Sequence, residues 1–177
     1  MEREHLEQTV RIVGLDLSLT ATGIADSSGA IVYKPKHKVP MIRLNEIDTF
    51  FREWIRTQKP QACVIENYAY SALNAREVIG ELHGVVRLAL HQATVPFALV
   101  APTQLKQFAT GSGRANKDAM VAIAARLGCP ANDNNAVDAW WLHKMSCEFY
   151  KLEGRLDLPK EQRDVVKKIE WPMRFAA

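Results

Sequence analysis

The sequence predicts an α/β fold, a mixed five-stranded sheet with helices on both faces. Two observations predict it: three short strand-like segments follow one another before residue 34, and two further apolar strands then alternate with amphipathic helices. Three antiparallel strands followed by alternating strands and helices give a mixed sheet covered by helices. With 177 residues, 47% of them hydrophobic, the chain suits one domain with a compact core.

The strands are predicted from runs of β-branched and apolar residues that are bounded by turn residues. The turn Ser27-Ser28-Gly29 separates two of them and makes the first three a meander. In chain order the predicted strands are Val10–Leu17, Thr22–Asp26, Ala30–Tyr33, Ala62–Glu66 and Phe97–Val100.

The helices are predicted from apolar residues that recur at helical spacing and from start and stop signals. Lys59-Pro60 ends the first helix, and Pro102 opens a short one, as proline does at a first helical position. Asp133, Asn134 or Asn135 caps the last core helix. In chain order the predicted helices are Leu44–Arg56, Ala75–Ala93, Pro102–Phe108, Asn116–Leu127 and Asp133–Tyr150. Trp54, Trp140, Trp141 and Phe50 are expected in the core.

Residues 1–9 are expected to form an N-terminal extension and residues 151–177 a polar tail with a short accessory helix. The first residues lack the apolar core of a signal peptide, and no apolar run approaches the ~20 residues of a membrane span. The three cysteines form no Cys-x-x-Cys pair, which favours reduced, mostly buried thiols. These features predict a soluble, cytoplasmic protein.

The formal net charge is +3, and the basic residues are clustered. They gather at Lys34–Lys38, at Lys106, Arg114 and Lys117, and in Arg163–Lys168. Such clusters can bind a phosphate backbone, but charge runs are also common on solvated surfaces, so charge alone leaves nucleic-acid binding open.

Three acidic residues stand at the ends of predicted elements. Asp16 lies within an apolar strand, Glu66 ends the strand ACVIE, and Asp138 lies in the first turns of the last helix. Parallel strands carry functional groups at their carboxyl ends in one crevice, so Asp16 and Glu66 would lie side by side if their strands are neighbours. The last helix could then deliver Asp138 to the same place.

Three converging carboxylates without His or Cys favour Mg²⁺ or Mn²⁺. Two such ions about 3.5–4 Å apart can activate a water and steady the leaving oxygen in phosphodiester hydrolysis. Taken singly, each residue has a structural alternative: Asp16 in a turn, Glu66 on the surface, Asp138 near a helix N-terminus that favours negative charge. Together, at convergent positions, they favour a metal site.

Four segments in order resemble motifs of RuvC-type Holliday junction resolvases of the RNase H-like superfamily, with the bacteriophage and prophage branch most similar. The segments are GLDLSLTATG (14–23), VIENYAY (64–70), PTQLKQFATGSGRANKDAM (102–120) and DNNAVDAWWL (133–142). The resemblance covers about residues 11–150 and implies an RNase H-like nuclease domain over residues 10–150.

The resemblance implies roles for individual residues. Asp16, Glu66 and Asp138 match the metal-binding carboxylates, with Mg²⁺ as cofactor, Mn²⁺ as a substitute and two ions per site. Lys106 and Lys117 match lysines that hold phosphate or stabilise the transition state; the alternative for both is a solvated surface lysine. Arg114 is a further candidate for DNA binding.

Several positions depart from the family pattern. A fourth metal-site residue often stands three positions before the last aspartate, where this chain has Asn135; Asn135 can ligate but carries no charge, and Asp133 replaces it or caps the helix. An aromatic wedge is replaced by Ala69, flanked by Tyr68 and Tyr70, either of which could stack on a base or pack in the protein.

The resemblance also implies a homodimer through the helix around Val78–Ala93, in which two sites nick opposing strands of a four-way junction and leave 5′-phosphate and 3′-hydroxyl ends. Alternatives stay open. They are a nuclease of the superfamily that acts on RNA, flaps or forks, and a catalytically inactive junction-binding module, which Asn135 favours. An actin-like or sugar-kinase phosphotransferase shares the strand–Asp–turn element, but it needs two lobes, for which this chain is too short.

Overall fold

The computed structural model of the chain describes residues 10–68 and 76–172. Within these ranges a five-stranded sheet has the order β3-β2-β1-β4-β5. The first three strands pair antiparallel, and β4 pairs parallel with both β1 and β5. The strands are β1 (Ile12–Asp16), β2 (Thr22–Asp26), β3 (Gly29–Tyr33), β4 (Ala62–Glu66) and β5 (Phe97–Val100).

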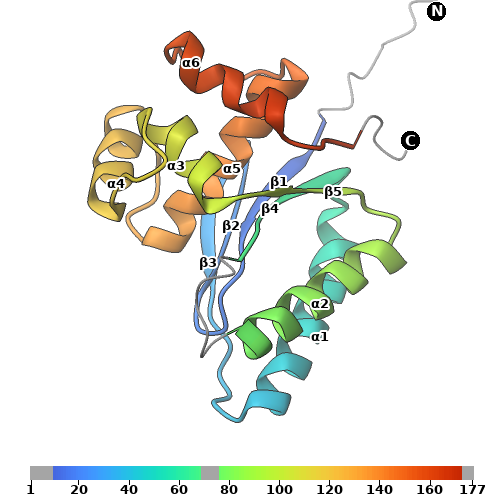
Figure 1. Cartoon of the computed structure of the whole chain (residues 1–177). Coiled ribbons are helices and arrows are strands. Elements are labelled where there is room, and N and C mark those ends of the chain that lie inside the picture. The colour runs from blue at the N-terminus through green and yellow to red at the C-terminus, as the bar shows by residue number, and fades with distance from the viewer. Residues whose placement is uncertain (1–9, 69–75, 173–177) are drawn as a thin grey trace, which may run out of the picture.

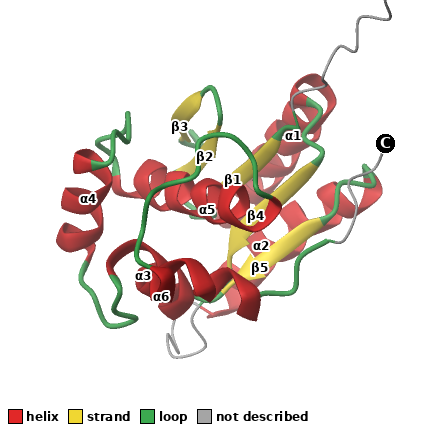
Figure 2. Ribbon diagram, turned by 90° about the horizontal axis from the view of Figure 1, so that it is seen from above, coloured by secondary structure: helices red, strands yellow, loops and turns green. Residues whose placement is uncertain are grey.

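Helices cover both faces of this sheet, so the predicted fold class is confirmed (Figures 1 and 2). The first two helices pack on one face with β1 and β4 side chains such as Leu15 and Ile65. The others pack on the opposite face, where Ile12 and Val64 point. The helices are α1 (Pro40–Gln58), α2 (Arg76–Gln92), α3 (Pro102–Thr110), α4 (Lys117–Arg126), α5 (Asn134–Tyr150), α6 (Lys160–Arg163) and the 3₁₀ helix η1 (Asp164–Lys168).

Two glycines let α5 lie unusually close to the sheet. A Cβ built on Gly14 of β1 would overlap the carbonyl oxygen of Ala139, and one on Gly23 of β2 would overlap that of Asn135. Any side chain at these positions would push the helix away. The glycines therefore fix the depth at which the N-terminal half of α5 sits on β1 and β2.

The elements expected from sequence are present, with shifted ends. α1 begins at Pro40 rather than Leu44, because proline fits the first helical turn, where its missing N–H is not needed. β1 is limited to Ile12–Asp16, shorter than the expected strand. α3 continues to Thr110, where Gly111 in the left-handed conformation ends it.

The C-terminal tail is packed against the domain. Val165, Val166 and Trp171 are buried in the same apolar core as α5, and the Trp171 ring stacks on Phe149 with 4.8 Å between centroids. Gln162 donates a 2.8 Å hydrogen bond to the carbonyl of Phe108 in α3. The tail thus covers α3 and the C-terminal half of α5 up to Pro172, the last described residue.

The aromatic residues expected in the core lie there for the most part. Trp54, Trp140 and Trp141 are buried, while Phe50 is half-buried and stacks on Tyr33. All three cysteines are free, and Cys63 and Cys147 are buried. Among the described residues, no helix combines the length and the apolar character that crossing a membrane requires.

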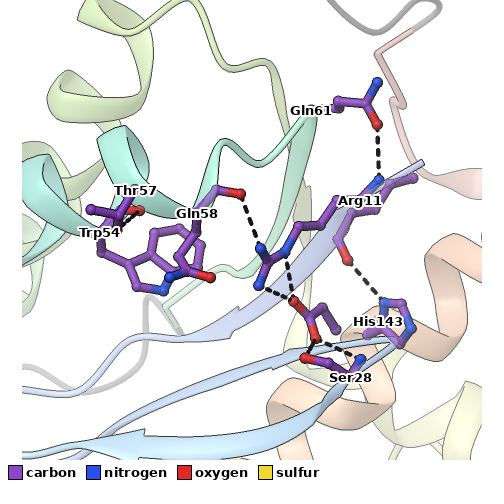
Figure 3. Close-up of polar contacts among 9 residues, drawn as sticks. Arg11, Ser28, Trp54, Thr57, Gln58, Gln61 and His143 are labelled. Atoms are coloured by element: carbon purple, nitrogen blue, oxygen red, sulfur yellow. Dashed lines mark hydrogen bonds and ion pairs between the residues drawn. The ribbon is translucent and has the colours of Figure 1, made fainter. Parts of the chain in front are cut away.

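A polar cluster ties the N-terminal end of β1 to its surroundings (Figure 3). The Arg11 guanidinium donates to the carboxylate of Asp26 and to the carbonyl of Gln58, and its backbone N–H donates to Gln61. On the other face, Nδ1 of the buried His143 lies 3.0 Å from the carbonyl oxygen of Ile12. These bonds fix α1 and α5 at the end of the sheet where β1 begins. The carboxyl ends of β1 and β4 lie at the opposite end of the sheet.

Candidate active site

The strand register places two acidic side chains next to each other. In the parallel pair β1–β4, Leu15 is opposite Ile65, so Asp16 and Glu66 follow as the last residues of neighbouring strands. Side chains alternate along a strand, and both acids follow residues that face α1 and α2. Asp16 and Glu66 therefore point to the α5 face.

Asp138 reaches the same place from the second turn of α5. Carboxylate oxygens of Asp16, Glu66 and Asp138 all lie within 4.8 Å of one another. Asp16 and Glu66 are half-buried and Asp138 is buried. The convergence expected from the sequence is present, and the close packing of α5 on Gly14 and Gly23 makes it possible.

Electrostatics at the cluster disfavour three negative charges. Burial, together with the neighbouring charge of Asp138, raises the pKa of Asp16 to about 7. Burial, with repulsion from Asp16 and Asp138, raises the pKa of Glu66 to about 8. Burial also raises the pKa of Asp138, although the cation of Lys117 opposes this rise. Positive charge at the cluster would remove the repulsion.

Lys117 supplies part of that positive charge. Its ammonium lies 3.2 Å from a carboxylate oxygen of Asp138. The side chain of Asn116 caps α4 by accepting a 2.9 Å hydrogen bond from the N–H of Ala119, which fixes Lys117 as the first residue of the helix. Burial alone would lower the pKa of Lys117, but attraction from Asp138, Asp16 and Glu66 raises it, so this lysine is a permanent cation.

Lys106 lies in α3, and its positive charge interacts with the carboxylates of the cluster without direct contact. Its charge lowers the pKa of both Glu66 and Asp138 against the effect of burial. Among the described residues no ion pair within 4.0 Å includes its ammonium. Lys106 is thus near enough to interact with an anion that reaches the cluster.

The donor set fits a hard divalent cation. Three carboxylates offer only oxygen, the ligand type that Mg²⁺, Mn²⁺ and Ca²⁺ prefer. Within the described ranges, no other group of three or more Asp, Glu, His or Cys side chains lies close enough together to hold an ion. One lysine does not neutralise three carboxylates, and a divalent ion would supply the missing charge.

The two candidates for a fourth ligand lie at the start of α5. The carboxylate of Asp133 accepts a 2.9 Å hydrogen bond from the N–H of Asn135, so it caps the helix. Its charge still raises the pKa of Asp16, which shows that it lies near the cluster. Asn135 is half-buried, with its backbone against Gly23.

The remaining residues near the motifs differ in their positions. Tyr68 packs against α2: its ring meets His83 edge-on with 5.0 Å between centroids. Tyr70 lies outside the described residues. Arg114 is exposed in the loop between α3 and α4. His143, farther along α5 than Asp138, bonds to Ile12 and contacts Cys147, so it packs within the protein.

Comparisons with known proteins agree with this architecture. A family model described as "Crossover junction endodeoxyribonuclease RuvC" matches residues 12–140. The crossover junction endodeoxyribonuclease RuvC of Pseudarthrobacter chlorophenolicus is 31% identical over 151 residues, which span 74% of this chain and 76% of that protein. The protein of the same name from Streptomyces avermitilis is 30% identical over 146 residues, spanning 73% of this chain and 82% of that protein.

Solved structures show the same fold. "T. thermophilus RuvC in complex with Holliday junction substrate" superimposes with a TM-score of 0.63 and 23% identity, covering 76% of this chain and 90% of that chain. The family model and the relatives agree with the four sequence motifs. The resemblance of these motifs to RuvC-type resolvases is therefore confirmed. The chain therefore belongs to the RuvC family of crossover junction endodeoxyribonucleases.

Proposed function

We propose that this chain is a crossover junction endodeoxyribonuclease that hydrolyses phosphodiester bonds in four-way or branched DNA and leaves 5′-phosphate and 3′-hydroxyl ends. The observation that carries the proposal is the group of three carboxylates within 4.8 Å at one edge of the sheet, with Lys117 beside them. Membership of the RuvC family supports it. One relative of known structure is described in complex with a Holliday junction.

Asp16, Glu66 and Asp138 would hold Mg²⁺, with Mn²⁺ as a substitute and two ions per site. Bound ions of this kind lower the pKa of water and stabilise the charge of the attacking and leaving oxygens in phosphodiester hydrolysis. Asn135 would add a neutral carbonyl oxygen, whereas the cap that Asp133 makes holds its carboxylate at the start of α5. Asn135 is therefore the better candidate for completing the site.

The chain's own cations would act on the phosphate. Lys117 and Lys106 lie on two different helices, and the carboxylates of the cluster attract the charges of both. Fixed cations beside the place where negative charge develops stabilise a transition state without reorganisation. Lys117, at 3.2 Å from Asp138, would hold the scissile phosphate, and Lys106 and Arg114 would bind phosphates next to it.

We further infer a homodimer through α2, because a four-way junction has nearly two-fold symmetry and two equivalent sites could nick opposing strands. Leu88 on the outer side of α2 is 50% exposed, and Gly84, one turn before it, has no neighbour within 4 Å of its Cβ position. A small residue one turn from an exposed leucine suits the close approach of a second helix.

The decisive experiment is cleavage of four substrates side by side, a four-way junction, a flap, a fork and an RNA–DNA hybrid, with Mg²⁺ and with Mn²⁺. We expect paired nicks in the junction and weaker cleavage of the rest. Asp16→Asn should abolish cleavage but retain junction binding, because it removes a ligand charge without enlarging the side chain. Preference for the hybrid would favour an RNA-directed nuclease.

Binding without cleavage by the unaltered protein would favour an inactive junction-binding module, the alternative that the neutral Asn135 supports. Nicking by Asp16→Asn at the unaltered rate would exclude the carboxylate cluster as the active site. Glu66→Gln and Asp138→Asn provide independent repeats of the same test, since each removes one charge from the cluster.

A further inference from the structure

A basic loop, residues Lys34–Lys38, lies at the same edge of the sheet as the carboxylates. β1 and β3 both pair antiparallel with β2, so they run in the same direction and end at the same edge. Across the sheet, Asp16 is opposite Gly23, and Gly23 is opposite Val32. Two strand spacings separate Asp16 from Val32, roughly 10 Å. The basic loop begins two residues later and leads into α1, at the lower end of the molecule in Figure 1.

Side chains of α1 fix the conformation of the basic loop. Glu46 of α1 accepts hydrogen bonds from the backbone N–H groups of Lys36 (2.8 Å) and His37 (3.0 Å), and it pairs with Nδ1 of His37 at 2.9 Å. Arg43 donates to the carbonyls of His37 (3.0 Å) and Lys38 (2.6 Å). The bonds to Glu46 hold the pKa of this carboxyl at about 2, so it stays ionised.

The carboxylate of Glu46 interacts with backbone N–H groups of the basic loop and with His37, and not with the lysine side chains. Lys34, Lys36 and Lys38 are exposed, and none of them forms an ion pair within 4.0 Å with any residue of the described ranges. Three like charges within five residues repel one another, and ordering the loop adds an entropic cost. A bound polyanion would remove the repulsion between the lysines. The entropic cost of ordering the loop would not arise again on binding, because the bonds to Glu46 and Arg43 already order it.

We propose that the basic loop is a second phosphate-binding surface, which holds the backbone of a duplex arm beside the cleaved strand. The proposal rests on the proposed junction nuclease function. Lys34 stands two residues beyond Val32, about 7 Å farther along the strand direction, so the basic loop begins roughly 12 Å from Asp16. Rise along one DNA strand is about 3.4 Å per nucleotide, so the loop would meet phosphates about four nucleotides from the scissile one. The basic loop contributes affinity and position, whereas Lys117 and Lys106 act at the cluster.

The test compares two triple variants that remove the same charge. One replaces Lys34, Lys36 and Lys38 by Gln. The matched control replaces Lys160, Lys167 and Lys168 by Gln; these exposed lysines of α6 and η1 lie at the upper end of the molecule in Figure 1. Junction affinity is measured from about 50 to about 300 mM salt without divalent ions, followed by cleavage at saturating junction.

We expect the loop variant to bind the junction at least tenfold more weakly at about 150 mM salt. The slope of log K against log salt should fall by about 0.9 for each phosphate that the loop no longer neutralises. The control should stay within twofold of the unaltered protein. Cleavage at saturating DNA should be unchanged in both variants, and a Lys→Arg triple variant of the loop should restore binding, because it keeps the charge.

Equal affinity and equal salt slope in the loop variant and its control would overturn the inference while leaving the nuclease intact. Failure of the unaltered protein to bind or cut branched DNA would instead refute the proposed function itself. Weak binding that the Lys→Arg variant does not restore would also count against phosphate binding by the loop, since charge alone should suffice for it.

Discussion

At the scale of single residues, burial and repulsion act together on the carboxylates that the proposed activity needs. In the folded protein the pKa values of Asp16, Glu66 and Asp138 are all raised, first by burial. A raised pKa in the folded state contributes stability at low pH, and this contribution is lost as the pH rises through the folded-state pKa. The site therefore opposes folding at neutral and alkaline pH unless a cation binds.

The metal-free protein should accordingly become less stable as the pH rises from about 6.5 to about 8.5, the range in which Asp16 (pKa about 7) and Glu66 (pKa about 8) ionise. We expect the free energy of unfolding to fall by about 2 kcal/mol. Burial lowers the pKa of His143 and of His83 to about 4, so both are neutral across this range and do not obscure the effect. Thermal unfolding with EDTA measures it.

Mg²⁺ should raise the melting temperature most at the alkaline end, because it binds the ionised carboxylates. Asp16→Asn should reduce both the pH dependence and the stabilisation by Mg²⁺. A metal-free melting temperature that is constant or rises across the same pH range would contradict the raised pKa values.

At the scale of elements, the depth of α5 on the sheet decides whether Asp138 meets the acids of the strands. The helix is fixed at one end by the cap of Asp133 and farther along by the bond between His143 and Ile12. Between these points the backbone of α5 lies directly on Gly14 and Gly23. A shift of α5 away from the sheet would therefore separate Asp138 from the acids of the strands.

Gly14→Ala should accordingly destabilise the protein by about 3 kcal/mol and also impair cleavage, because the new Cβ overlaps the carbonyl of Ala139. Gly84→Ala is the control for the change from Gly to Ala. Because Gly84 lies on the proposed dimer face of α2, both variants are compared at a concentration at which the protein is monomeric, where the open space around the Cβ position of Gly84 lets the substitution stabilise the helix by about 1 kcal/mol. Urea unfolding measures both. Equal stability of the two variants would show that α5 is not held by close contact.

The bounds of the elements could be predicted only in part. Hydrophobic runs locate β4 and β5 to the residue, because both are short, buried strands bounded by turn residues. The ends of α1, α3 and β1 shift by one to four residues, since local signals such as Pro40 and Gly111 compete with the apolar pattern. The roles of Gly14 and Gly23 have no local signal at all, because their partners lie over a hundred residues away in α5.

At the scale of the whole molecule, the proposed activity on a nearly symmetric substrate requires two sites. Sedimentation at tens of micromolar should show a dimer. Leu88→Glu, on the outer side of α2, should give a monomer that still binds metal but does not make paired cuts. Ile31→Glu is the control, since Ile31 is 59% exposed on β3, away from α2. A monomeric unaltered protein with full resolving activity would refute the dimer.

The sequence by itself determined the order and type of the elements, the three acids at the element ends and the resemblance that led to the family. These depend on local patterns: periodicity, turn residues and a charge in an apolar run. Only the tertiary structure decided that the acids meet within 4.8 Å, that Lys117 rather than Lys106 pairs with Asp138, and that Asp133 caps a helix. The physical reason is that strand register and helix depth depend on contacts between distant residues, which one-dimensional patterns do not specify.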